Sequence, residues 1–255
     1  MEDVTRREML GRSVRVTGVT LLGIAALEAG QGTTRDSAAQ RRKILVAGAH
    51  PDDPETGCGG AMARFAGMGH EVVALYLTRG EAGIPGKTHR EAARIRIGEA
   101  QTACTILNAR PLFAGQIDGA TEITAQRYDE VYDILKMESP DVIFTHWPVD
   151  SHRDHRICSV LVYDAWLRLG KSVPLYYYEV MSGIQTQQFL PTRYVDITDT
   201  VEQKHRACFA HVSQKIKQSY PNDHGKMESF RGLEYGCRAA EAFIRHSRSS
   251  SPPML

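Results

Sequence analysis

The residues with the clearest chemical potential lie directly after a short apolar run. Residues 44–47 read Ile-Leu-Val-Ala, and His50, Asp52 and Asp53 follow this run. An ionised carboxylate is strongly unfavourable in an apolar environment unless a hydrogen bond or a metal ion compensates it. In open α/β sheets, ligands bind just beyond the carboxyl ends of the strands. The pattern therefore predicts a buried strand that delivers a metal-competent cluster to a ligand site.

A second polar cluster follows a second apolar run. Residues 142–144 read Val-Ile-Phe, and His152, Asp154 and His155 come soon after them. His152 and His155 are three positions apart at the start of an expected helix, so they can share one of its faces. A catalytic zinc ion usually takes three nitrogen or oxygen ligands and keeps one position for water. A single histidine is usually an ordinary hydrogen-bonded residue, but two such clusters at strand ends together predict a metal centre.

The elements that must bring these clusters together alternate along the chain. Apolar runs rich in β-favouring residues predict strands at 43–49, 71–78, 111–114, 141–146, 175–180 and 194–197. Helical spacing of apolar residues predicts helices at 59–68, 88–107, 124–138, 152–169, 199–214 and 227–246. This alternation predicts an α/β fold with a doubly wound, mainly parallel sheet and helices on both faces. The first and fourth strands of such a sheet are neighbours where the strand order reverses, so both clusters would open into one crevice.

The composition is typical of one globular domain. The 255 residues are 42% hydrophobic and 24% charged, with a formal net charge of +1. This near-neutral balance argues against a nucleic-acid or membrane-surface binder, because both need concentrated positive charge. The five cysteines form no CxxC pair, so neither a disulfide framework nor a thiolate zinc site is expected. The oligomeric state is left open.

Residues 1–40 have the character of an export leader. Arg6 and Arg7 precede an uncharged stretch at 16–27, which is followed by a segment rich in small and polar residues. The uncharged stretch is too short to cross a bilayer, which needs about 20 apolar residues, and the order resembles a twin-arginine signal peptide. We therefore expect export to the periplasm or the extracellular space, with no stable membrane insertion after processing. The alternative is a short amphipathic first helix in a cytoplasmic protein.

After the leader, the chain is expected to consist of one domain and a short disordered end. Residues 41–246 would form one domain, since no linker is evident within them. The Ser-Pro-rich end at 247–255 would be disordered.

Longer motifs around both clusters are shared with a known family. HPDDPE at 50–55, the glycine-rich segment 57–60 and HRDH at 152–155 resemble the PIG-L/LmbE-like family of zinc-dependent N-deacetylases. Segments 77–83, 96–100 and 118–119 match further, and the resemblance extends over residues 41 to 240. It implies a Rossmann-like fold and the removal of acetyl groups from N-acetylglucosaminyl compounds and related amides.

The resemblance implies a ligand set for the metal. His50, Asp53 and His155 would be the ligands, and zinc is the favoured ion. Ferrous iron or cobalt would also suit two histidines and one aspartate. Pro54 should restrict Asp53 to extended backbone and so fix its direction.

Catalytic roles are implied for three further residues. Asp52 would be the general base that activates water. His152 would stabilise the oxyanion or act as an acid, and Asp154 would orient it or tune its pKa. Some relatives carry a tyrosine where this chain has Asp150, so the source of a second oxyanion donor stays open.

Substrate-binding roles are implied for Arg96, Asp118 and Glu81. Arg96 and Asp118 match positions that contact the sugar, and Glu81 lies in a loop that borders the site. A helix-surface ion pair is an equal alternative for Arg96. A turn role before Gly119 is an equal alternative for Asp118.

The expected activity is metal-dependent hydrolysis of the N-acyl group of a small-molecule amino sugar or glycoconjugate. One alternative is an amidase of the same fold that acts on another N-acyl or conjugate substrate. A non-catalytic sugar-binding relative is the alternative from a different class. The chain has every expected ligand and the base, which favours the enzyme. Specificity for the group beyond the amide would lie in loops such as 83–88 and 182–192.

Overall fold

The computed structural model describes residues 41–249 and 255. The expected leader at 1–40, and residues 250–254 of the expected tail, lie outside the described residues. Residues 247–249 follow the last strand, and Ser249 Oγ accepts a hydrogen bond from the Leu175 N–H at 3.1 Å. Within the described ranges, we find no helix with the length and hydropathy needed to cross a bilayer.

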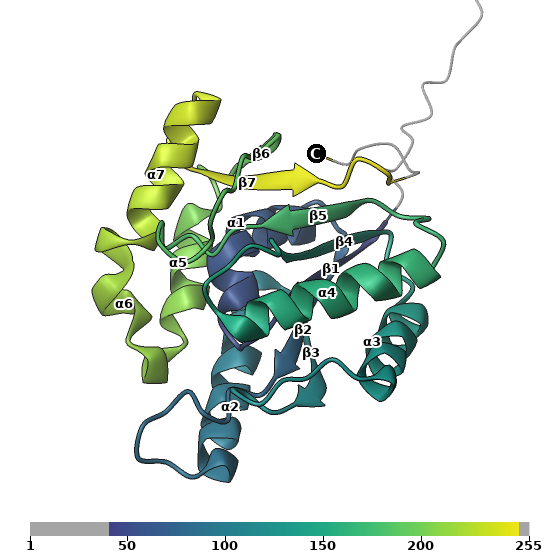
Figure 1. Ribbon diagram of the computed structural model, residues 1–255. Coiled ribbons are helices and arrows are strands. Elements are labelled where there is room, and N and C mark those ends of the chain that lie inside the picture. Colours follow the sequence, from purple (N-terminus) through teal and green to yellow (C-terminus); the bar gives the residue numbers. More distant parts are fainter. Residues whose placement is uncertain (1–40, 250–254) are drawn as a thin grey trace, which may run out of the picture. The chain divides into compact units, whose positions relative to one another are not determined.

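A seven-stranded sheet in the order β3-β2-β1-β4-β5-β7-β6 lies at the centre of the fold (Figure 1). Strands β1 to β5 pair in parallel, whereas β7 runs antiparallel to both β5 and β6. The expected α/β architecture with a doubly wound, mainly parallel sheet is confirmed. The strands are β1 (Lys43–Gly48), β2 (Glu71–Thr78), β3 (Arg110–Gln116), β4 (Val142–His146), β5 (Leu175–Tyr178), β6 (Arg193–Asp196) and β7 (Ala240–Arg245).

Helices cover both faces of the sheet (Figure 1). Side chains of alternate strand residues point to opposite faces, so each strand contributes to two cores. One core includes Ile44 and Val46 and packs against α1, α2 and α5, whereas the other includes Leu45 and Ala47 and packs against α3 and α4. The helices are α1 (Asp53–Gly67), α2 (His89–Leu107), α3 (Ala125–Glu138), α4 (Arg153–Arg168), α5 (Val201–Phe209), α6 (Ile216–Ser219) and α7 (His224–Tyr235).

Helix α1 begins earlier than we expected. It starts at Asp53, directly inside the first cluster, rather than at residue 59. The expectation that Pro54 holds Asp53 in extended backbone is wrong, because a proline is well tolerated in the first turn of a helix. The unusual backbone is at Asp52, whose φ of 121° lies in a region that non-glycine residues rarely adopt.

The end of the chain also differs from the expectation of one helix over 227–246. Helix α7 stops at Tyr235, because Gly236 takes a left-handed conformation with φ of 90° and ends it. Strand β7 then enters the sheet between β5 and β6. The expected helix at 199–214 is likewise divided into α5 and a short 3₁₀ helix, Val212–Gln214. All five cysteines are free.

Candidate active site

The two polar clusters meet because β1 and β4 are adjacent. The strands pair in parallel with Ile44 opposite Val142 and Val46 opposite Phe144. Each cluster lies where its strand ends and the next helix begins: Asp53 opens α1, and His152 is the N-cap of α4. The crevice expected at the reversal of strand order is therefore where both clusters lie.

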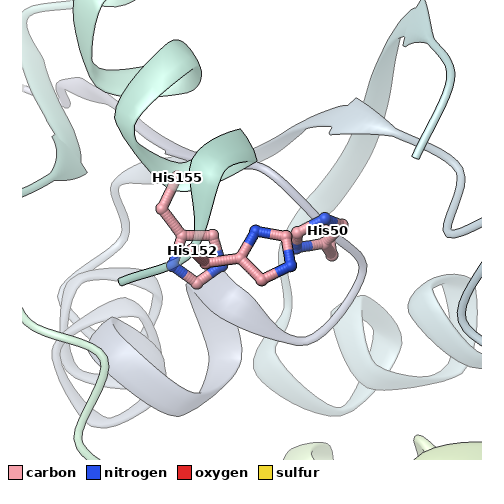
Figure 2. Close-up of side chains that lie close together, drawn as sticks. All are labelled: His50, His152 and His155. Atoms are coloured by element: carbon pink, nitrogen blue, oxygen red, sulfur yellow. The ribbon is translucent and has the colours of Figure 1, made fainter. Parts of the chain in front are cut away.

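His50, Asp53 and His155 come together around the Asp53 carboxylate. His50 Nδ1 lies 3.3 Å from Asp53 Oδ2, and His155 Nε2 lies 3.3 Å from Asp53 Oδ1. Figure 2 shows His50, His152 and His155 side by side. Their ligand atoms all lie within 4.8 Å of one another. One ligand atom from each of Asp53, His146 and His155 also lies within 4.8 Å of the other two.

The second nitrogen of each of two imidazoles faces a carboxylate. His50 Nε2 lies 3.2 Å from Asp118 Oδ1 and 3.3 Å from Asp154 Oδ2. His155 Nδ1 lies 3.2 Å from Asp150 Oδ1. Metal-binding histidines usually donate their other N–H to such an acceptor, which fixes the ring and raises its basicity. Nitrogen and carboxylate donors arranged in this way fit a divalent cation such as zinc.

The charged groups of this cluster shift one another's pKa values. Burial raises the pKa of Asp53, but His155 and His146 outweigh it and hold that pKa well below its usual value. Burial lowers the pKa of His155, but Asp53 and Asp150 outweigh it and raise the pKa to about 9. Burial lowers the pKa of His146 to about 4. In the absence of a cation, the protein thus carries a carboxylate beside a protonated imidazole.

Asp52 and the buried Arg96 form an ion pair beside the cluster. Arg96 is 2% exposed, and its Nη2 donates to the Pro51 carbonyl and, at 3.1 Å, to Asp52 Oδ2. The helix-surface ion pair, one of the two alternatives for Arg96, is wrong in its location, since the guanidinium is buried. Arg96 also lines the cavity that opens over the cluster, but its Nη2 already donates to the Pro51 carbonyl and the Asp52 carboxylate.

His152 and Asp154 are connected through the backbone. The Asp154 N–H donates to His152 Nδ1 at 3.2 Å, so the neutral imidazole carries its proton on Nε2. Burial lowers the pKa of His152. The Asp154 carboxylate, expected to orient His152 or tune its pKa, lies against His50 and accepts hydrogen bonds from the Gly119 N–H and the Thr121 hydroxyl. Its charge raises the pKa of His152, but burial outweighs it.

The other two expected substrate-binding residues differ in their positions. Asp118 Oδ1 contacts His50, and its Oδ2 accepts a hydrogen bond from the Ala82 N–H at 3.2 Å. Glu81 is 3% exposed, and its carboxylate accepts hydrogen bonds from the N–H groups of Arg79 and Asp118. Asp118 therefore lies at the cluster, whereas Glu81 stabilises the loop behind it.

Sequence reasoning assigned no role to His146 or Asp150. His146 ends β4, and its Nε2 lies 3.1 Å from the Ala49 N–H and 3.2 Å from Asp53 Oδ2. Asp150 accepts a hydrogen bond from the Thr186 hydroxyl besides contacting His155. The tyrosine that some relatives have is therefore replaced by a carboxylate that holds an imidazole. His146 could have been noticed as a polar residue closing an apolar strand.

A cavity of about 560 Å³ opens over these residues. One wall comes from the strand ends and includes His50, Asp52, Asp118, His152 and His155. A later wall comes from more distant parts of the chain: Val180, Gln185, Gln214, Ile216 and His224.

Comparison with known proteins places the chain in a family. The sequence profile of the GlcNAc-PI de-N-acetylase (PIG-L) family matches residues 45–166. A diacetylchitobiose deacetylase from Thermococcus kodakarensis is 30% identical over 190 residues, which cover 68% of this chain and 70% of that relative. This chain belongs to the PIG-L family.

Other similar proteins agree with this assignment. The uncharacterized deacetylase YaiS of Escherichia coli is 32% identical over 146 residues, covering 54% of this chain and 73% of YaiS. The structure of an N,N'-diacetylchitobiose deacetylase from Pyrococcus horikoshii superposes with a TM-score of 0.72 at 26% identity, covering 81% of this chain and 84% of that one. Both polar clusters lie inside the segment that matches the PIG-L profile, whereas the cavity wall that begins at Val180 lies outside it.

Proposed function

We propose that this protein is a divalent-metal-dependent hydrolase that removes the acetyl group from an N-acetylglucosamine-type amide. The observation that carries the proposal is the paired arrangement of His50 and His155. Each ring directs one nitrogen to Asp53 and the other to a carboxylate, in the cavity that also holds Asp52 and His152. The similarity to diacetylchitobiose deacetylases supports the amino-sugar substrate.

His50, Asp53 and His155 would hold the cation. Zinc suits this donor set best, and ferrous iron or cobalt is compatible with it. A cation bound there would supply Lewis-acid chemistry, lowering the pKa of water and polarising the amide carbonyl.

The protein's own groups would move the protons. Asp52 takes a proton from the attacking water and passes it to the nitrogen as the C–N bond breaks, which yields acetate and a free amine. The Nε2–H of His152 donates to the carbonyl oxygen as negative charge develops there. Because His152 Nδ1 already accepts from the Asp154 N–H, the oxyanion-donor role fits it better than the acid role.

One experiment distinguishes the proposed deacetylase from its two alternatives, an amidase of the same fold and a non-catalytic sugar-binding relative. Metal is removed with a chelator, and zinc, ferrous iron (without oxygen) or cobalt is restored. Release of free amine is then measured from N-acetylglucosamine, diacetylchitobiose and a panel of other N-acyl amides. We expect amine release from the N-acetyl sugars that disappears with the metal and returns on reloading. Turnover confined to other amides would favour the amidase alternative, and metal binding with no turnover would favour the non-catalytic sugar-binding relative.

We also propose that the protein is exported by the twin-arginine route. The proposal is supported by Arg6 and Arg7 ahead of the uncharged stretch at 16–27. Replacing both arginines with lysine should keep the protein in the cytoplasm, as measured by fractionation and immunoblotting. Unchanged distribution between the compartments would favour the cytoplasmic alternative.

A further inference from the structure

The later wall of the cavity offers polar groups that the proposed reaction does not use. Gln185, Gln214 and His224 contribute to it, and all three follow residue 166, where the family match ends. Gln214 Nε2 already donates to the Gly83 carbonyl and to Ser213 Oγ, both at 3.0 Å. These hydrogen bonds leave Gln214 with a structural role, which directs attention to the other two side chains.

His224 differs from its neighbours in being unpaired. Gln185 Nε2 lies 3.5 Å from His155 Nδ1. By contrast, His224 Nδ1 is buried and has no hydrogen-bond partner among the described residues. A buried polar group in this state needs an explanation, because leaving it unsatisfied is unfavourable. Because no hydrogen bond among the described residues fixes the proton of Nδ1, this nitrogen can carry either an N–H or a lone pair, and His224 lines the cavity.

The residue is nevertheless held in position. Asp223 Oδ1 accepts a hydrogen bond from the backbone N–H of His224 at 2.6 Å at the start of α7, and the Tyr220 ring lies 5.3 Å from the imidazole. The Tyr220 hydroxyl donates to Glu228, which pairs with the buried Lys204 at 3.0 Å. A binding group that is ordered before the ligand arrives loses less entropy when it binds.

The chemistry of the imidazole indicates which ligand group His224 would meet. The cavity lining presents charges of both signs, from Asp52 and Asp118 and from Arg96, so it does not select an anionic or a cationic group by charge alone. Burial lowers the pKa of His224, which keeps the ring neutral. A neutral imidazole both donates and accepts hydrogen bonds, as a hydroxyl group does.

We propose that His224 is a substrate-binding residue that hydrogen-bonds a hydroxyl group of the amino sugar. This inference rests on the proposed deacetylase function and deepens it. It places part of the sugar recognition on α7, beyond the segment that carries the metal and the base.

Kinetics with matched variants test this role. His224→Phe keeps a ring against Tyr220 but removes both nitrogens, whereas His224→Gln retains an amide that can donate and accept. We expect His224→Phe to raise the KM for N-acetylglucosamine by about 3- to 10-fold, the value of one neutral hydrogen bond, with little change in kcat. His224→Gln should recover part of the loss. The exposed Lys226 in the same turn provides the control, and Lys226→Ala should leave KM unchanged.

Deoxy sugars identify the contacted hydroxyl. N-acetylglucosamine lacking the hydroxyl at carbon 3, 4 or 6 is compared in the wild type and in His224→Phe. For one of these sugars the two proteins should have the same KM, because the interaction is then already absent. A KM that His224→Phe leaves unchanged for every sugar would overturn the proposal. A loss confined to kcat would do so as well.

A binding measurement separates this inference from the proposed function. Zinc-loaded Asp52→Asn protein, with and without His224→Phe, is titrated with N-acetylglucosamine and observed by NMR. Weaker binding of the double variant supports His224 even if no deacetylation is detected in the wild type. Equal binding by both proteins, or no sugar binding by either, would contradict the role of His224.

Discussion

Asp52 and Asp53 are adjacent in the chain, yet their carboxylates have different neighbours. Asp53 lies among imidazoles at the start of α1, whereas Asp52 pairs with Arg96. The positive φ of Asp52 turns the backbone between them, and such a conformation costs about 1–3 kcal/mol. Arg96 helps to hold it by binding both the Pro51 carbonyl and the Asp52 carboxylate.

Because Asp52 and Asp53 have different neighbours, the role of Asp52 as the proposed base can be tested separately from metal binding. Asp52→Asn removes the proton acceptor but keeps the size of the side chain, so the bound metal should stay. We expect kcat to fall by about 10²- to 10⁴-fold, the usual contribution of a positioned acid or base. Metal content is measured by elemental analysis and turnover by amine release. Asp53→Asn is the matched comparison and should lose metal, and an Asp52→Asn protein with full activity would contradict the assignment.

Binding of the metal should release protons at neutral pH. The pKa of His155 is about 9 in the metal-free protein, so this imidazole is protonated at about pH 7 and must lose its proton to become a ligand. Metal affinity should therefore rise as the pH approaches about 9, where His155 loses its proton. Calorimetric titration with zinc in buffers of different ionisation enthalpy counts the released protons. A count of zero, or an affinity independent of pH, would contradict the prediction.

The raised pKa of His155 also stabilises the metal-free fold in a defined pH range. A raised pKa means that the folded protein binds the proton more tightly than the unfolded chain. The contribution of His155 is therefore fully present below about pH 6.5 and is lost as the pH rises through about 9.

At the scale of elements, the alternation of strands and helices was predictable and the end of the chain was not. Apolar runs reveal β1, β2 and β4 because these strands are buried on both faces. The run Ala-Glu-Ala-Phe-Ile-Arg at β7 combines helix-favouring alanine and glutamate with strand-favouring residues. It forms a strand because it pairs with β5 and β6, which no local pattern reveals.

In the candidate site, too, some residues were predictable from the sequence and others were not. His50, Asp53 and His155 belong to contiguous motifs at element boundaries, so their proximity followed from the order of the strands. His224 and the Asp53–His146 contact depend on side chains from separate elements meeting in space. Such contacts were beyond the reach of patterns within one segment.

A buried ionic network joins several of the later elements. Lys204 on α5 is 0% exposed, and its Nζ lies 3.0 Å from Glu228 on α7 and 2.8 Å from Glu241 on β7. The Glu241 carboxylate also accepts hydrogen bonds from the N–H groups of Gly60 and Ala61 in α1. The network therefore connects the helix that carries Asp53 to the segment that carries His224.

Removing the lysine should be strongly destabilising. Lys204→Met keeps the length of the side chain but leaves two buried carboxylates without a cation, and breaking such a pair costs about 3–5 kcal/mol. Urea unfolding followed by circular dichroism measures the change in the free energy of unfolding. Arg127 on α3 forms surface pairs with Glu122 and Glu130, so Arg127→Ala should cost less than about 1 kcal/mol. If both variants lost a similar free energy of unfolding, the buried network would contribute no more to stability than a surface ion pair.

At the scale of the whole molecule, the site depends on long-range assembly. Its proposed ligands come from residues 50–53 and 155, and the groups that hold them come from Asp118 after β3 and from Asp150. An unfolded chain does not bring these groups together, so a cation should bind the folded state far more tightly.

Such preferential binding predicts that the metal stabilises the entire fold. At a free zinc concentration of about 100 times Kd, the gain in the free energy of unfolding should be about 2.7 kcal/mol. Thermal unfolding followed by calorimetry should show a Tm that rises with zinc concentration. Asp53→Asn should remove this dependence because it removes a ligand, whereas Asp52→Asn should keep it because Arg96, rather than a cation, pairs with that carboxylate. An equal zinc response in both variants would place the cation away from Asp53 and would require a different ligand set.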